Sequence, residues 1–394
     1  MPVVKHGNRV KQVEACVQSS RFWQLFTILK LETNMRVSDN DDNFRSWLLS
    51  LGNGTLETFD KLGEDIIEIP EHFIENGDIL DSIFGKKLYP NQSHEFQDKA
   101  ILCPTNKEVH RLNLRLLNRL EGEMRTYKSA DSIVLDENVN PTDYPMEFLN
   151  GLTPSGTPLH ELNLKVGAII MLMRNLNSQR GLCNGTRLVV ESMLNNLIIA
   201  KVLTGKAKGN IVFIPRIDIV PSDTDLPFQL KRRQFPVMLA FVMTINKSQG
   251  QSLDSVGIYL ENPVFSHGQL YVAFSRARSK DKVKVKVLKT FAQGKLIRKS
   301  NRVFTKNIVY KEVFDRSAFQ EQHEERFLSR QMDVFEHEEN ADAWFDENMH
   351  NLHSQCELIE AEDLELEEAM LAMQMFEDPV EEILIEDDPP LENE

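Results

Sequence analysis

The sequence predicts an α/β protein that contains a smaller β-rich segment and ends in an acidic stretch. An apolar run at residues 237–245 ends in a polar loop, NKSQGQ at 246–251, and a second apolar run follows at 256–260. Short β-rich runs lie between residues 162 and 221, and glutamate becomes abundant after residue 316. Because ligands of open α/β sheets bind beyond the carboxyl ends of the strands, the polar loop is the first candidate site.

The segments before the polar loop alternate between helical and extended patterns. Residues 10–29 have a helical pattern, residues 44–51 are amphipathic, and IIEIP at 66–70 predicts a short strand. Residues 101–105 predict another strand, and the periodic apolar residues of 109–120 predict a helix. This alternation is the basis of the α/β prediction.

The β-rich segment consists of four runs, VGAIIMLM, TRLVVES, LIIAKVL and NIVFIPRI, separated by turn residues such as Asn184-Gly185. Short strands at regular spacing are typical of a small β-barrel. Because α/β patterns flank these runs on both sides, we expect the barrel to be an insertion.

Composition excludes several classes of protein. A chain of 394 residues has room for two or three domains, and its 41% hydrophobic and 27% charged residues are ordinary for a soluble protein. No apolar run approaches the length of a membrane span, and the N-terminus lacks a signal-peptide pattern. The four cysteines have no paired spacing, which argues against a disulfide framework or zinc site and favours reduced intracellular thiols.

The net charge of −15 is unevenly distributed along the chain. Residues 331–394 contain 23 Asp and Glu and no Lys or Arg, so residues 1–330 hold 37 Asp and Glu and all 45 Lys and Arg, a net charge of +8. A basic body suits a polyanion such as nucleic acid, although a charge of this size is also compatible with a mild surface bias. The acidic segment is expected to be disordered and solvated, or to form a helix that docks on the body or a partner.

The motifs TINKSQGQSLD and HGQLYVAFSRARS together resemble the last two motifs of Pif-like DNA helicases, superfamily one class B. Within that family, the match resembles most the helicases of Helitron transposons. The resemblance continues through four further segments and covers about the first four-fifths of the chain. These segments are ILCPTNKEVHRLN (101–113), YPMEFLNGLTPSG (144–156), LKVGAIIMLMRNLNSQRGLCNGTRL (164–188) and NIVYKEVF (307–314).

The resemblance implies a RecA-like second motor domain with an inserted small β-barrel and an acidic tail. Residues 1–37, where PVVKHGNR resembles the end of the third helicase motif, would be a remnant of the first motor domain. Residues 38–161 and 222–315 would form the second motor domain, 162–221 the barrel of the helicase 2B type, and 316–394 the tail. Roles in DNA repair, recombination and telomere maintenance, and a nuclear location, are implied in the same way.

Two arginines match the family's catalytic arginine fingers, Arg36 in LETNMR and Arg276 in YVAFSRA. The resemblance implies that both reach toward the γ-phosphate of ATP from across a domain interface. A guanidinium suits this role because it is permanently charged and its planar fork matches phosphate oxygens. The alternative for either arginine is an ordinary surface ion pair.

The polar loop matches the family's fifth motif, which couples the nucleotide cleft to single-stranded DNA. Hydroxyl and amide side chains can bond to phosphates in any sequence, a lysine adds charge, and a glycine lets the backbone approach a ligand. An ordinary polar turn is the alternative. The candidate DNA-binding residues are Thr244, Asn246, Lys247 and Ser248, and the candidate nucleotide-binding residues are Gln249 and Gly250.

Thr105 and Asn106 match a position where the family contacts the DNA backbone. Tyr271 and Phe274 are candidates for stacking on bases, although core packing is the commoner role of such residues. Three arginines of the β-rich segment, Arg174, Arg187 and Arg216, are further candidates to face DNA, and the sequence does not orient them.

Nucleotide hydrolysis by such a motor requires a phosphate-binding glycine loop with its lysine. The pattern G-x-x-x-x-G-K-[ST] does not occur in the sequence. Residues 133–137, IVLDE, have the form of a magnesium-binding motif but lie after the 101–105 strand, so we expect a surface loop and no metal site. ATP and magnesium are implied for the full-length family, whereas this chain alone is not expected to bind them tightly.

Taken together, the sequence predicts a fragment of a 5′-to-3′ ATP-dependent DNA helicase. The fragment would supply the arginine-finger and single-stranded-DNA side of the motor and would be inactive as an ATPase alone. Its expected partners are single-stranded DNA and the missing first motor domain, with no membrane. The alternatives are a non-enzymatic DNA-binding or regulatory module and a decayed transposon relic.

Overall fold

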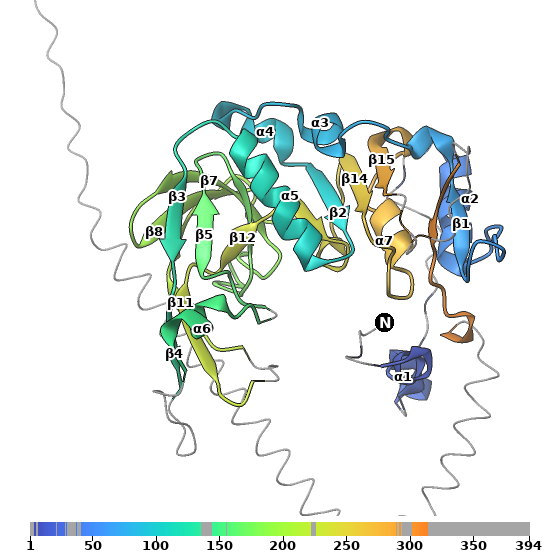
Figure 1. The fold of residues 1–394 in the computed structure, drawn as a ribbon, viewed down its shortest axis with the longest axis horizontal. Coiled ribbons are helices and arrows are strands. Elements are labelled where there is room, and N and C mark those ends of the chain that lie inside the picture. Colours follow the sequence, from blue (N-terminus) through green and yellow to red (C-terminus); the bar gives the residue numbers. More distant parts are fainter. Residues whose placement is uncertain are drawn as a thin grey trace, which may run out of the picture. The chain divides into compact units, whose positions relative to one another are not determined.

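The protein is described by a computed structural model (Figure 1). The described residues are 7–20, 22–27, 41–134, 144–154, 156–221, 226–288 and 302–313, with single positions at 4, 29, 37, 290 and 293. The chain divides into two compact units, 1–326 and 327–394, and the second unit lies outside the described residues. The acidic tail expected from residue 316 is therefore outside them as well.

A four-stranded parallel sheet forms the centre of the described α/β region. Its strand order is β13-β2-β14-β15, and all three pairings are parallel. The strands are nearly continuous apolar runs because helices and connecting segments cover the sheet. Their bounds are β2 (Lys99–Cys103), β13 (Val242–Thr244), β14 (Ser255–Leu260) and β15 (Val283–Val287).

Helices α3 (Ile79–Phe84) and α5 (Asn106–Arg119) pack on this sheet, whereas α7 (Gln269–Phe274) contacts β14 and α2 (Asp42–Asn53). Helix α5 places Val109, Leu112, Leu116 and Leu117 toward the core, as the periodicity predicts. Helix α3 approaches β14 closely at Gly257, where a Cβ atom would lie 2.8 Å from Cγ1 of Ile101 and 3.0 Å from Cγ1 of Ile83.

The N-terminal segment differs from the helix expected over residues 10–29. An α-helix, α1, covers only Arg9–Glu14, and two short 3-10 turns follow at Val17–Ser19 and Trp23–Leu25. The hydroxyl of Ser19 donates to the Val13 carbonyl, and the Ser20 hydroxyl accepts from the Phe22 amide. Such local bonds compete with helical ones, which explains why the helix stops.

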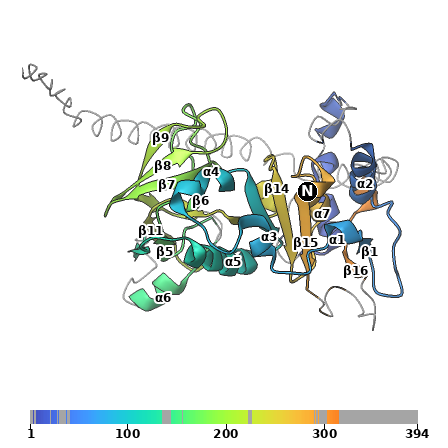
Figure 2. The same cartoon turned by 90° about the horizontal axis from the view of Figure 1, so that it is seen from above.

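The remaining strands form antiparallel sheets (Figure 2). The largest has the order β12-β6-β7-β8-β9, and smaller ones are β10-β11-β4, β3-β5 and β1-β16. The bounds are β1 (Ile66–Ile69), β3 (Arg125–Lys128), β4 (Ala130–Ile133), β5 (Glu161–Leu164), β6 (Ile169–Leu172), β7 (Arg187–Met193), β8 (Leu197–Val202), β9 (Ile211–Pro215), β10 (Ile217–Ile219), β11 (Leu230–Gln234), β12 (Val237–Leu239) and β16 (Val303–Lys306). Two short helices, α4 (Ser93–Phe96) and α6 (Met146–Gly151), complete the described α-helices and strands.

The expected small β-barrel is not confirmed. In the part of the chain that the structure describes, the five-stranded sheet is open, with β12 and β9 as its two edges. Antiparallel strands also begin before residue 162, at β3 and β4, and continue after 221, at β11 and β12. The assignment of residues 162–221 to an inserted domain stays a prediction.

The apolar run at 237–245 contributes a strand to each of two sheets. Its first part, β12, pairs antiparallel with β6, and its second part, β13, pairs parallel with β2. The change occurs at Ala240 and Phe241, whose amide and carbonyl groups bond to Ile169 and Ile101 respectively. The antiparallel region is therefore joined directly to the strand that precedes the polar loop.

Arg187 on β7 links the two sheets at this junction. Its guanidinium donates to the carbonyls of Gln97 (2.8 Å), Lys99 (2.9 Å) and Ala240 (3.2 Å). The side chain is fully buried, and burial lowers its pKa to about 10. The expectation that Arg187 could face DNA is wrong, because its donors are directed at backbone acceptors inside the protein.

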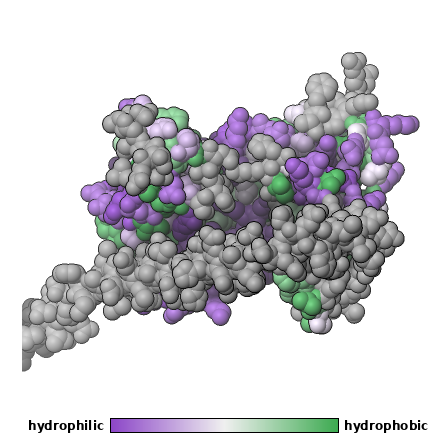
Figure 3. All heavy atoms as spheres, turned by 90° about the horizontal axis from the view of Figure 1, so that it is seen from below, coloured by the Kyte–Doolittle hydropathy of each residue, from purple (hydrophilic) through white to green (hydrophobic). Residues whose placement is uncertain are grey.

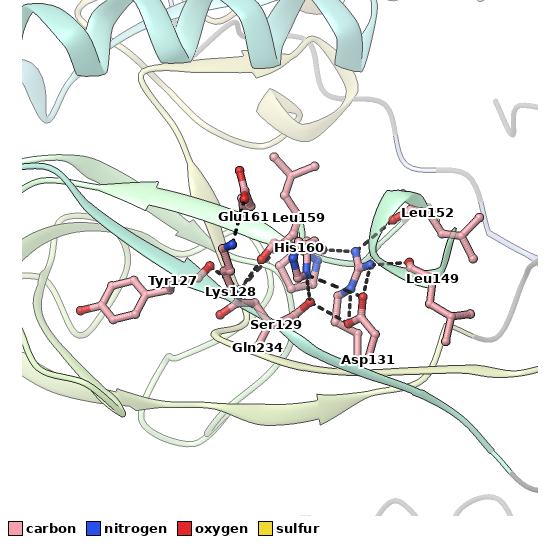
Figure 4. Close-up of polar contacts among 12 residues, drawn as sticks. Tyr127, Lys128, Ser129, Asp131, Leu149, Leu152, Leu159, His160, Glu161 and Gln234 are labelled. Carbon is pink, nitrogen blue, oxygen red and sulfur yellow. Dashed lines mark hydrogen bonds and ion pairs between the residues drawn. The ribbon is translucent and has the colours of Figure 1, made fainter. Parts of the chain in front are cut away.

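A second buried arginine, Arg232 on β11, organises the region around α6. Three of its partners, Asp131, Leu149 and Leu152, are labelled in Figure 4. Its Nε and Nη2 donate to the two carboxylate oxygens of Asp131 at 2.9 and 2.7 Å. Further donors bond to the carbonyls of Leu149, Leu152 and Pro158. All five N–H groups of the guanidinium are thereby satisfied, as a buried cation requires.

No helix among the described residues combines the length and the apolar character needed to cross a membrane. The nuclear location stays a prediction.

Replacing Arg187 by lysine tests the link between the sheets. We expect Arg187→Lys to lower the free energy of unfolding by about 2 kcal/mol, because one ammonium cannot reach three carbonyls and remains a buried charge. Urea denaturation measures this loss, and Arg278→Lys, at a side chain that is 63% exposed, is the matched control. Equal stability of Arg187→Lys and the parent chain would contradict the assignment.

Candidate functional site

Three polar segments meet at the carboxyl edge of the parallel sheet. The polar loop follows β13, Thr105 and Asn106 follow β2, and Asn262 follows β14. Register places Thr244 beside Cys103, and Leu102 beside Ile258, so the three strands end at a common edge. Segments more than a hundred residues apart in sequence are thus brought together where open α/β sheets bind ligands.

Thr105 caps helix α5. Its hydroxyl accepts from the Glu108 amide at 3.4 Å, and the Glu108 carboxylate accepts from the Thr105 amide at 3.2 Å, which completes a capping box. The Thr105 hydroxyl also donates to that carboxylate at 3.0 Å. The Thr105 side chain therefore caps the start of α5. Asn106, the first residue of the helix, is exposed and available to a ligand.

Glu108 was not among the predicted site residues. Its buried carboxylate also accepts from the Asn262 amide at 3.1 Å and from Asn262 Nδ2 at 2.9 Å. One carboxylate thus connects the ends of β2 and β14. The capping-box pattern T-x-x-E at 105–108 was the available sequence signal, because it predicts a helix start and a fixed glutamate.

The polar loop begins with a 3-10 turn at Asn246–Ser248. The fully buried Ser248 hydroxyl donates to the Ile245 carbonyl at 2.6 Å, and the Thr244 hydroxyl accepts from the Lys247 amide at 3.4 Å. The structure therefore places both hydroxyls in the turn itself. The buried Ser248 hydroxyl is thus used within the turn, whereas the half-buried Thr244 hydroxyl accepts one bond and keeps its own donor. Direct contact of either residue with DNA stays a prediction.

The exposed part of the loop consists of Asn246, Gln249 and Gly250. The Oδ1 atom of Asn246 accepts from Nε2 of the buried Gln269 at 3.2 Å, which orients the amide. Gly250 has φ +84°, a left-handed conformation that favours glycine. Gln269 is a second residue that the sequence analysis missed, and no simple pattern marks it.

Lys247 lies partly buried beside the loop. Its Nζ donates to Sδ of Met238 at 3.0 Å, and burial lowers the pKa of the ammonium below its ordinary value. A partly desolvated cation interacts more strongly with an anion than a fully hydrated one does. Lys247 supplies the positive charge of the polar loop and is therefore well suited to bind a phosphate.

Arg276, the expected arginine finger, is buried, with only 4% of its surface exposed. Its Nη1 donates to the carbonyls of Gln251 (3.0 Å) and Ser248 (3.4 Å), and its Nε donates to the Val272 carbonyl at 2.8 Å. The guanidinium thereby ties the polar loop to helix α7. The catalytic role stays a prediction, and Arg36, the other expected finger, lies outside the described residues.

The remaining candidates, Phe274, Tyr271 and Arg216, lie in different surroundings. Phe274 is buried and packs edge-on against Trp47 and Phe73, whereas Tyr271 is partly exposed. Arg216 stacks on the rings of Tyr127 and Phe235. Core packing is thus confirmed for Phe274.

The described residues do not fit a complete ATP site. They contain neither a glycine-rich phosphate loop nor, within the ranges given above, a group of three or more metal-ligating side chains. Ile133, at the start of the sequence IVLDE, lies on β4, and residues 135–137 fall outside the described residues. No catalytic step through ATP or magnesium can be derived from this geometry.

Comparison with known proteins supports the family suggested by the motifs. Residues 147–193 match the family model for the 2B domain of the DNA helicase Pif1, and residues 1–61 match that for PIF1-like helicases. The relatives of this chain are Pif1-like helicases. The ATP-dependent DNA helicase PIF1 of Xenopus laevis is 31% identical over 277 residues, which is 70% of this chain and 38% of the relative. The human protein of that name is 36% identical over 201 residues, 49% and 28% of the two chains.

The solved structure of Pif1 helicase from Candida albicans supports the fold. It has a TM-score of 0.50 and 23% identity, and the match covers 78% of this chain and 64% of that one. The mixed α/β, RecA-like fold is therefore confirmed. The chain spans less than two-fifths of the vertebrate relatives described here, and the Helitron type stays a prediction.

The contacts of Arg276 predict a structural effect that a residue acting only on a nucleotide would lack. We expect Arg276→Ala to lower the free energy of unfolding by about 3 kcal/mol, because the carbonyls of Gln251 and Ser248 lose their donor. Arg278→Ala, whose side chain is 63% exposed, should change it by less than about 0.5 kcal/mol. Chemical denaturation distinguishes the two variants, and equal stabilities would show that Arg276 does not hold the loop.

Proposed function

We propose that this chain supplies the single-stranded-DNA-binding and arginine-finger side of the motor of a Pif1-like, ATP-dependent 5′-to-3′ DNA helicase. The observation that carries the proposal is the meeting of three polar segments at one edge of the parallel sheet. Arg276 and Glu108 fix those segments from within. The chain alone does not hydrolyse ATP.

Single-stranded DNA fits the chemistry of this edge. The exposed amides of Asn106, Asn246 and Gln249 can bond to phosphate or sugar oxygens of any sequence, and Lys247 supplies a cation. Such contacts give affinity without base specificity, as a motor that moves along DNA requires. The relatives' printed names describe DNA helicases, which agrees with this ligand.

The arginine-finger role requires a change of partners at Arg276. In the described state its donors are directed at the carbonyls of the polar loop. A phosphate oxygen forms a stronger, charge-assisted bond with a guanidinium than a neutral carbonyl does. We propose that, where a first motor domain of this family supplies a bound nucleotide, the Arg276 guanidinium would turn toward its phosphates, which would couple nucleotide binding to the polar loop.

A non-enzymatic DNA-binding module is the second candidate. The charge of +8 on residues 1–330 favours it, since a basic body binds DNA with or without a motor. Both proposals predict DNA binding, and they differ in whether addition of a first motor domain of this family generates ATP hydrolysis.

Binding of a fluorescent oligothymidine tests the DNA-binding site. We expect Lys247→Met to weaken binding equally for oligonucleotides of different sequence and to reduce the slope of log affinity against log salt by about 1, as for one lost phosphate contact. Fluorescence anisotropy at several salt concentrations measures both effects. Lys206→Met, at an exposed position on the turn before β9, is the matched control and should leave both unchanged.

An ATPase assay with single-stranded DNA tests the catalytic part of the proposal on the same samples. The chain alone should show no DNA-stimulated turnover. Robust turnover that Arg276→Ala abolishes would contradict inactivity in isolation. Oligothymidine binding that Lys247→Met leaves intact would contradict the placement of the DNA.

A further inference from the structure

The loop between β14 and α7, residues 261–268, exposes a phenylalanine beside the polar loop. Phe265 is 46% exposed, whereas its neighbours Val264 and Ser266 are buried. Apolar side chains are exposed at other places as well, and the coloured part of the face in Figure 3 shows small hydrophobic patches on a mostly hydrophilic surface. Because single exposed apolar residues are common, exposure alone does not identify Phe265 as a contact residue.

The backbone on both sides of Phe265 is held in place by side chains. Asn262 donates from its amide and from Nδ2 to the buried Glu108 carboxylate, at 3.1 and 2.9 Å. The Phe265 amide donates to Oε1 of Gln269 at 3.1 Å. A contact with the ring therefore costs little ordering entropy, because the backbone that carries it is already fixed.

The side-chain amide of Gln269 connects Phe265 to the polar loop. Its Oε1 atom accepts from the Phe265 amide, and its Nε2 atom donates to Oδ1 of Asn246 at 3.2 Å. Gln269 is buried, with 2% of its surface exposed, so the bridge is shielded from water. One amide group thus separates the backbone of Phe265 from the side chain of Asn246, an exposed residue of the proposed DNA site.

Phe265 fits base stacking better than the two aromatic residues that the sequence suggested for this role. Phe274 is buried in the core. Tyr271 faces helix α2, where a Cβ atom on Gly52 would lie 3.0 Å from Cδ2 of the tyrosine ring. Phe265 leaves nearly half of its surface accessible, and it lies on the loop that follows β14 at the carboxyl edge of the parallel sheet.

We propose that the Phe265 ring stacks on a base of the single-stranded DNA bound at this edge. The exposed amides and Lys247 hold phosphates and sugars, and the ring adds an apolar contact to a base. Every base has a π-face, so stacking strengthens binding without sequence preference. It also favours single strands, because the bases of a duplex are already stacked on each other. This inference rests on the proposed function and adds a base contact to it.

Two oligonucleotides test the stacking contact on the full chain: oligothymidine, and a strand of the same length whose sugars carry no base. We expect Phe265→Ala to weaken oligothymidine binding about tenfold and to leave binding of the abasic strand unchanged. Phe265→Tyr keeps an aromatic ring and should bind like the parent. Phe213→Ala removes a 45% exposed phenylalanine from the edge strand β9 and is the matched control. Fluorescence anisotropy measures all four affinities.

The pattern of losses separates the stacking contact from the proposed site. Phe265→Ala that binds oligothymidine like the parent, or that weakens binding of both strands equally, would overturn the stacking contact. Lys247→Met should weaken binding of both strands, because it removes a phosphate contact that does not involve the base. If Lys247→Met weakens neither, the proposed DNA site is wrong and the stacking contact is wrong with it.

Photocross-linking supplies a measurement on the parent chain that does not depend on a variant folding. An oligonucleotide that carries 5-iodouracil in place of thymine cross-links on irradiation to an aromatic side chain that stacks on the base. We expect mass spectrometry of the digested adduct to locate the cross-link at Phe265. The absence of a cross-link, or a cross-link confined to another residue, would overturn the proposal.

Discussion

The hydrogen bonds from Arg276 to the carbonyls of Ser248 and Gln251 are the interaction on which the site depends. The polar loop contains a single 3-10 turn and a glycine with positive φ, so it has little regular structure of its own. The guanidinium supplies the missing partners and connects the loop to α7. Under the proposed function, Arg276 would hold the polar loop in one state and contact a nucleotide phosphate in another. It would thereby link the nucleotide site directly to the DNA-binding loop.

Buried arginines have a similar role elsewhere in the described region. Arg187 connects three carbonyls across two sheets, and Arg232 connects Asp131 to three carbonyls around α6. The planar fork of arginine explains this use, since it reaches several fixed acceptors at once and remains charged when buried. Arg187 thereby adds side-chain bonds to the backbone connection between the antiparallel strands and the parallel sheet.

The sequence predicted the local elements of the site better than its connections. The strand expected at 101–105 is β2, the helix expected at 109–120 is α5, and the apolar run at 256–260 is part of β14. Periodicity determines such elements because their residues interact over short separations. The contact between Glu108 and Asn262 spans 154 residues, and no local pattern encodes it. For the same reason the sequence could not show that Arg187 is buried or that the β-rich strands form an open sheet.

Hydrogen exchange of the chain with and without oligothymidine tests the central claim most directly, because it locates the bound DNA without a substitution. Slower exchange in the polar loop at 246–251 and in the first turn of α5, relative to the free chain, is the result that this account predicts. Protection confined to the antiparallel sheets, with no change at the carboxyl edge of the parallel sheet, would contradict it.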